Sequence, residues 1–204
     1  MKNSFFKTKT LIMLLFLTIG CSETEKEVFT PTLPPITQTG ENTFGCYIDG
    51  KLLVPRDRSV FGGTTVKGMT ISEYSSSPTE IDFFNLRIID GQSDVGDFSF
   101  YLYNLDELGE GTYNIKKGNL WQSTSDIKTI NFWLKTPRNI SVKRYFSIEN
   151  GGTLTIIKYD YTNGIISGTF SCKAINNNDS SDVIEITEGR FDINLNTLND
   201  TEFP

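Results

Sequence analysis

The chain has 204 residues, a formal net charge of -6 and no histidine. Without histidine there is no Ser-His-Asp or Cys-His relay, no histidine general base and no His-ligated zinc. The excess of acidic side chains argues against partners that need clustered Lys and Arg, namely nucleic acids and anionic lipid headgroups. With 37% hydrophobic and 12% aromatic residues, the composition is that of a folded chain with its own core.

The first segment has the three parts of a secretory signal. Three lysines precede an apolar run from Leu11 to Ile19, and the small Gly20 lies directly before Cys21. The run has roughly nine residues, well short of the ~20 that a membrane-spanning helix needs. This order resembles a bacterial lipoprotein signal peptide over residues 1–20. The resemblance implies cleavage before Cys21 and a lipid on its sulfur. The alternative is an ordinary secretory signal, with Cys21 as a plain thiol.

The next segment, residues 21–41, is expected to be the lipidated cysteine followed by a flexible tether. Ser22 and the glutamates at positions 23, 25 and 27 resemble the residues that send Bacteroidota lipoproteins to the outer membrane and its outer surface. A merely solvated linker is the alternative explanation for these acids. The Pro- and Thr-rich stretch from Thr30 to Thr37 favours extended polyproline-like backbone. We therefore expect attachment to the outer membrane through the lipid on Cys21, with the domain facing the periplasm or the cell surface.

From Asn42 onward, apolar and polar residues alternate in short runs that are separated by turn residues. Asp49-Gly50 and Asn163-Gly164 are hairpin signals. In chain order, the predicted strands are 44–48, 52–54, 64–74, 81–89, 98–103, 112–115, 129–135, 143–148, 153–159, 165–174, 183–187 and 190–195. One helical turn is expected at Leu105–Leu108. This pattern predicts a single all-β domain over residues 42–204, an antiparallel β-sandwich, with a lipocalin-like β-barrel as the alternative.

Three segments of this domain carry a second resemblance. Thr43–Lys51, Asn163–Ser171 and Thr187–Asp192 together resemble an uncharacterised family of small Bacteroidota outer-membrane lipoproteins. The shared residues are turn glycines and core aromatics, so the resemblance implies a fold and a cellular location. It implies no activity, because none is attached to the family.

Two further cysteines, Cys46 and Cys172, lie in strand-like runs. Alternation along each run places both side chains on the apolar, inward face. A disulfide between them would need Cα atoms within ~7 Å of each other. The alternative is a pair of buried free thiols that behave as small hydrophobic side chains.

Several aromatic residues are expected on the outer face of the sheets. If Phe98, Phe100 and Leu102 point inward, the intervening tyrosines point outward, and Tyr145 is expected outward beside an inward Phe146. Exposed aromatic rings are platforms for sugars or anchors for protein partners. The alternative is that loops or a second layer cover this face. The candidate ligand-binding residues are Tyr101, Tyr103, Trp121, Trp133 and Tyr145.

Acidic residues are the remaining candidates for metal binding or catalysis. Asp90, Asp94 and Asp97 lie in an oxygen-rich loop that is a weak calcium candidate, and Asn176–Asp182 is another, but neither has the EF-hand spacing. Asn and Asp also form turns without any metal.

No cofactor and no catalytic residue is singled out. We expect a surface module that binds a ligand or partner, such as a glycan or protein, or has a structural role. The alternative is a carboxylate-dependent hydrolase of extracellular glycans.

Overall fold

Antiparallel strands make up most of the protein. The computed structural model describes residues 29–74, 83–103, 105–118, 130–135 and 143–204. Its strands are β1 (Thr43–Ile48), β2 (Lys51–Leu53), β3 (Arg58–Ser59), β4 (Thr65–Val66), β5 (Met69–Tyr74), β6 (Phe83–Ile89), β7 (Asp97–Tyr103), β8 (Gly111–Asn114), β9 (Ile130–Lys135), β10 (Arg144–Asp160), β11 (Ile165–Asn176) and β12 (Asp179–Asn194). The helical turn α2 (Leu105–Leu108) and the 3-10 turn η2 (Leu198–Asp200) are short. The predicted all-β class is confirmed, as is the helical turn after β7.

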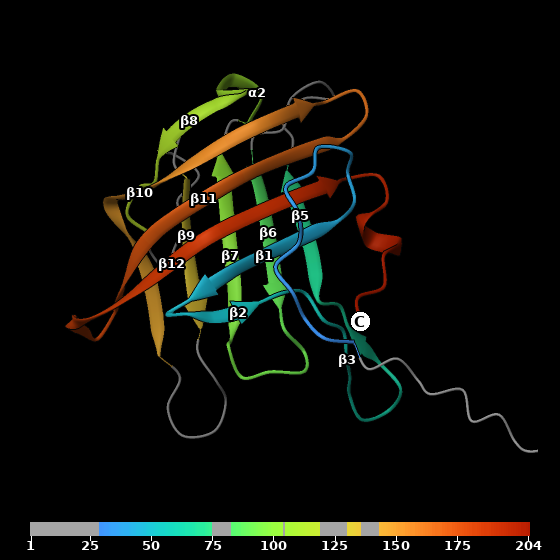
Figure 1. Ribbon diagram of the computed structural model, residues 1–204, viewed down its shortest axis with the longest axis horizontal. Helices are drawn as coiled ribbons and strands as arrows, with labels where there is room; N and C mark the ends of the chain where they lie inside the picture. The colour runs from blue at the N-terminus through green and yellow to red at the C-terminus, as the bar shows by residue number, and fades with distance from the viewer. Residues whose placement is uncertain (1–28, 75–82, 104, 119–129, 136–142) are drawn as a thin grey trace, which may run out of the picture. The chain divides into compact units, whose positions relative to one another are not determined.

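One ten-stranded sheet folds over so that its two halves pack against each other. Its strand order is β2-β1-β12-β11-β10-β9-β7-β6-β5, with β8 beside β10. In Figure 1, β1, β12 and β11 run across the front while β5, β6, β7 and β9 lie behind them at a steep angle. Among the described strands the order is open, with β2 and β5 at its ends. The predicted sandwich is therefore confirmed, and the sheet is not closed into a barrel.

The sheet folds over along β10, which has 17 residues. The beginning of this strand pairs with β9 and its second half pairs with β8. The register with β11 shifts between Ser147 and Gly152, where Asn150 has a φ of 54°. A Cβ on Gly152 would lie 2.0 Å from the Ser171 carbonyl oxygen. Glycine thus allows the close approach at this irregularity, and bulges of this kind bend strands.

Phenylalanine side chains fill the core between the two halves. The ring centroid of Phe170 in β11 lies 5.3 Å from that of Phe100 and 5.8 Å from that of Phe98, both in β7. Phe44 of β1 lies 5.6 Å from Phe98. Burial of each ring stabilises the fold by about 1.5–3 kcal/mol. Phe98, Phe100 and Leu102 are fully buried, as the alternation in β7 predicted.

Part of the segment before β1 is folded onto the sheet. The compact unit comprises Pro31–Pro204. Asp192 of β12 is only 1% exposed, and its carboxylate accepts hydrogen bonds from the backbone N–H groups of Thr39, Gly40 and Glu41 at 2.9, 2.8 and 3.3 Å. The predicted tether over residues 21–41 is therefore too long, because its second half belongs to the folded unit. We call residues 31–41 the N-terminal strap.

Candidate functional site

A groove with a volume of about 850 Å³ lies over β10 and β11. Its floor is apolar and consists of Phe146, Ile148 and Ile175. Its rim is polar and consists of Lys117, Glu149, Asn177, Asn178, Asp179 and Ser180. We call this feature the β10–β11 groove. Its volume lies within the range of pockets that hold small ligands.

The floor lies on the face of the sheet that points away from the core. Tyr145 and Ala174 belong to the core cluster, so their neighbours Phe146 and Ile175 point the other way. Phe146 is paired in register with Ile175, and Ile175 is paired with Val183 of β12, which is 43% exposed. The outer face of an antiparallel sheet usually carries polar residues. Within this apolar row across three strands Phe146 is only 5% exposed, whereas Ile175 is half-buried and Val183 is exposed, so Ile175 and Val183 supply most of the candidate contact surface.

This arrangement reverses the orientation expected for the start of β10. Tyr145 was expected to point outward and Phe146 inward, but Tyr145 is 4% exposed and packs in the core. Because Tyr145 and Phe146 are adjacent and both aromatic, the alternation of the sequence allows either of them to be the inward residue. A shift of one residue exchanges the two faces of a strand. Ile175 carried a usable signal, because it is an apolar residue at an outward position of the well-alternating β11.

A polar network fixes one end of the groove. Oδ2 of Asp182 accepts hydrogen bonds from Lys143 Nζ at 2.8 Å, Asn176 Nδ2 at 2.9 Å and Tyr145 Oη at 3.0 Å. The hydrogen bonds from Lys143 and Asn176 are the main reasons why the pKa of Asp182 falls to about 2. Burial and the bond to Asp182 raise the pKa of Tyr145. The network therefore holds a carboxylate and a neutral phenol in place, and connects β10 to the β11–β12 turn.

The turn between β11 and β12 forms the rim next to this network. Asn178 N–H donates to Asn176 Oδ1 at 2.9 Å, and Asn177 N–H donates to the Arg144 carbonyl oxygen at 2.8 Å. Asp179 accepts from both the N–H and the hydroxyl of Ser181. The oxygen-rich segment 176–182 thus forms local turn contacts. These hydrogen bonds fix the backbone of the turn, and its polar side chains line the groove.

The opposite rim is held by Glu149 and the segment after β8. The carboxylate of Glu149 accepts from the Lys117 N–H at 2.9 Å and from Lys116 Nζ at 3.0 Å, and these bonds lower the pKa of Glu149. The Ser147 hydroxyl donates to the Lys116 carbonyl oxygen at 2.7 Å. Both rims are therefore fastened to β10 by specific hydrogen bonds.

The two carboxylates that line the groove do not form an acid–base pair. A glycosidase needs one carboxyl group that keeps its proton, which requires a raised pKa. Hydrogen bonds from Ser181 lower the pKa of Asp179, and the pKa of Glu149 is lowered as well. Both groups are therefore ionised near neutral pH. Neither carboxylate has the raised pKa that a general acid needs.

The predicted aromatic platform is not assembled among the described side chains. Tyr103 is 5% exposed, and burial, with a smaller effect of Tyr101, raises the pKa of Tyr103 to about 12. Tyr101 is half-buried. The expectation of exposed rings at Tyr103 and Tyr145 is therefore wrong: burial of Tyr103 agrees with the covered-face alternative, whereas Tyr145 points into the core. Trp121 lies outside the described residues, as does the side chain of Trp133, whose Cα is paired with that of Phe146.

Cys46 and Cys172 are buried free thiols. They lie on β1 and β11, and β12 lies between these strands. Two strand spacings amount to about 10 Å, which exceeds the ~7 Å limit for a disulfide. Burial raises the pKa of both thiols, so neither is a reactive thiolate.

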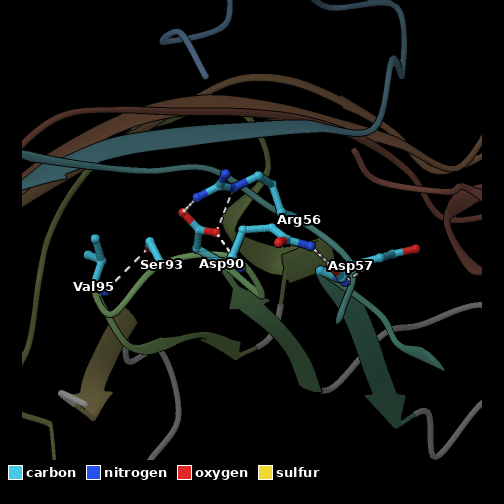
Figure 2. A network of polar contacts seen from close by, with 7 residues as sticks. Arg56, Asp57, Asp90, Ser93 and Val95 are labelled. Atoms are coloured by element: carbon cyan, nitrogen blue, oxygen red, sulfur yellow. Dashed lines mark hydrogen bonds and ion pairs between the residues drawn. The ribbon is translucent and has the colours of Figure 1, made fainter. Parts of the chain in front are cut away.

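The three calcium candidates do not converge on a cation site. Asp90 is buried and accepts from Arg56 Nε and Nη2 at 2.6 and 2.8 Å (Figure 2). Asp97 pairs with Arg87 at 3.0 Å, and Asp94 is exposed. Within the described ranges, no group of three or more His, Cys, Asp or Glu side chains is placed to hold a metal ion. Arginines already neutralise two of these three carboxylates, and this arrangement disfavours a calcium site in the loop.

Comparison with family models, curated proteins and solved structures found no match for this chain. Cys21, the predicted lipidation site, lies outside the described residues. Within the described ranges, no helix combines the length and the apolar character that a membrane crossing requires.

Proposed function

We propose that this protein is a lipid-anchored binding module of the outer membrane and that the β10–β11 groove holds a neutral glycan. The observation that carries the proposal is the combination of an apolar floor with a rim of amide, hydroxyl and charged groups. A sugar ring has an apolar C–H face and a periphery of hydroxyls, so it needs both kinds of surface. Phe146 and Ile175 supply the floor, and Asn177 and Asn178 supply the rim.

The charges around the groove favour a neutral ligand. Lys117 and Glu149 have opposite charges, and Asp179 adds a further negative charge. A phosphate or sulfate group would need several cations, which this rim does not offer. Trp133 is the register partner of Phe146, so it remains a proposed contributor to the same site.

The anchoring part of the proposal is supported by the residues before the folded unit. Cys21 follows an apolar segment and a small residue, and these resemble a lipoprotein signal. The hydrolase alternative has weaker support, because both carboxylates of the groove have lowered pKa values.

The binding test uses the mature chain in native gels that contain neutral polysaccharides, followed by titration calorimetry with oligosaccharides of any polysaccharide that retards it. Ile175→Asp places a charge on the floor, and Asn177→Ala removes an amide from the rim. We expect the floor variant to weaken binding by about tenfold or more, since ~1.4 kcal/mol is tenfold in affinity. Ile36→Ser is the matched control, because Ile36 is an exposed apolar residue that does not line this groove.

Two results would contradict the glycan proposal. One is the absence of retardation by any neutral polysaccharide. The other is binding that Ile175→Asp leaves unchanged, which would place the ligand elsewhere on the domain. Circular dichroism of each variant confirms that the fold is intact.

A further inference from the structure

Phe61 lies at the tip of the β3–β4 hairpin and is fully exposed, at 107% of its reference area. The hairpin is short but ordered: Val60 N–H donates to the Thr64 carbonyl oxygen at 2.9 Å. Gly62 and Gly63 have φ angles of 93° and 78°, a left-handed conformation that favours glycine. The turn therefore presents Phe61 outward in a defined position.

The base of the hairpin is fastened to the sandwich. Figure 2 shows the ion pair between Arg56 and Asp90. Arg56 lies just before β3 in the chain. Gly68 N–H donates to Asp57 Oδ1 at 2.6 Å, and Lys67 Nζ donates to the Thr201 carbonyl oxygen at 2.8 Å. The chain is thus tied down on both sides of the hairpin.

A phenylalanine at this tip has no role in the turn itself. Turns favour Gly, Asn, Asp, Ser and Pro, and an exposed Phe forgoes about 1.5–3 kcal/mol of burial. Phe61 does not belong to the core cluster. The ring is therefore open to contact with a surface outside the described part of the domain.

Residues 56–67, which include the hairpin, contain three basic residues and one acidic residue, whereas the whole chain has a net charge of -6. Arg56 and Lys67 form ion pairs with Asp90 and Asp57. Arg58, the first residue of β3, is half-buried, and its Nε is buried without a hydrogen-bond partner among the described residues. A guanidinium group binds phosphate oxygens through several N–H donors. The hairpin thus combines an exposed aromatic ring with a half-buried guanidinium group whose Nε has no hydrogen-bond partner among the described residues, a pairing that suits the interface of a phospholipid bilayer.

We propose that the β3–β4 hairpin is a second contact with the bilayer, in which Phe61 enters the interfacial region and Arg58 binds a lipid phosphate. This inference rests on the proposed lipid anchor. The chain from Cys21 to Pro31 spans at most about 35 Å, and the folded unit has a radius of gyration of about 16 Å. The domain is therefore held beside the bilayer, where a contact too weak to act alone is favoured by a high effective concentration.

The test anchors the mature chain to vesicles through Cys21. Maleimide-phosphatidylethanolamine in phosphatidylcholine vesicles reacts with this thiol, whereas Cys46 and Cys172 are buried. Phe61→Trp reports on the tip, and Tyr161→Trp is the control at another exposed aromatic position, in the β10–β11 turn. We expect the emission of the Phe61→Trp protein to shift to the blue on anchoring. Brominated phosphatidylcholine should quench it more strongly than in the control or the unsubstituted chain.

Equal quenching in the two Trp variants would overturn the proposal, because it would show no preference for the hairpin. No quenching of Phe61→Trp would also overturn it and would direct attention to a protein partner. Adding Arg58→Gln to Phe61→Trp should reduce the quenching, and an unchanged signal would refute the phosphate contact. Because the anchor is made chemically, these results do not depend on whether cells lipidate Cys21 or whether the groove binds a glycan.

Discussion

Asp182 is the side chain with the most strongly organised surroundings near the groove. The side chains of Lys143, Tyr145 and Asn176 all donate hydrogen bonds to one of its carboxylate oxygens. The ionised form is stabilised, which lowers the pKa of Asp182 from 3.8 to about 2. A carboxylate whose pKa is lower in the folded than in the unfolded state stabilises the fold above its unfolded pKa. This stabilisation is lost as the pH falls through the folded value.

We predict that Asp182→Asn reduces the acid dependence of stability. The melting temperature of the wild-type protein should fall between about pH 4 and pH 2, the window between the two pKa values of Asp182. The Asn variant should melt at a lower temperature near neutral pH and show a smaller decrease across this window. Asp94→Asn is the control, because Asp94 is exposed and the described residues offer it no hydrogen-bond or ion-pair partner. Parallel pH profiles for the wild type and Asp182→Asn would contradict the prediction.

The N-terminal strap shows how a segment without regular structure becomes part of a fold. It lies against β12, and Asp192 satisfies three of its backbone N–H groups. The Arg190 side chain also donates to the Pro34 carbonyl oxygen at 3.3 Å. Gly45 of β1 leaves room for this passage, since a Cβ there would lie 2.5 Å from Pro34 Cδ. The strap therefore depends on a few specific contacts with β1 and β12.

We predict that Asp192→Ala releases the strap while the sandwich stays folded. The amides of Thr39 and Gly40 should lose their protection from hydrogen exchange, and the unfolding free energy should fall by about 1–3 kcal/mol. Asp192→Asn keeps one acceptor oxygen and should have an intermediate effect. The amide of Ile193 serves as the internal reference and should remain protected. Fast exchange of Thr39 and Gly40 in the wild type would show that the strap is not docked.

At the scale of the whole molecule, one folded sheet separates the core from the candidate site. The inward residues of β1, β7, β11 and β12 pack together, which leaves the outer face of β10 and β11 available for the groove. Because the strap belongs to the folded unit, the predicted tether is limited to the residues before Pro31. If Cys21 carries a lipid, the short tether keeps the proposed glycan groove and the proposed hairpin contact close to the membrane surface.

We predict that Cys21→Ser moves the protein from the membrane fraction to the soluble fraction. Two or more acyl chains are needed for stable anchoring, and the proposed hairpin contact is too weak to hold the protein on the membrane alone. Labelling with a clickable fatty acid should also disappear in this variant. Cys172→Ala is the control, because this thiol is buried and should affect neither measurement. Membrane retention of Cys21→Ser would contradict the lipoprotein assignment.

Local alternation was sufficient to predict much of the core. In β7 and β11 every second residue is apolar or small, and the structure buries Phe98, Phe100, Phe170 and Ala174 as expected. The same reasoning failed in β10, because Tyr145 and Phe146 are adjacent and both are aromatic. Their orientation depends on pairing with β9 and β11, which lie elsewhere in the chain. The groove could not be found without that register.

By itself, the sequence determined the all-β class, the turns and the inward residues of the regularly alternating strands, and it predicts the lipid anchor at Cys21. These properties follow from the period of two along a strand and from the composition of neighbouring residues. Only the tertiary structure decided that the strap is docked, that the cysteines are separated by a strand and that Phe146 faces outward. These features depend on strand order and register between distant segments, and a shift of one residue reverses the face that each side chain occupies.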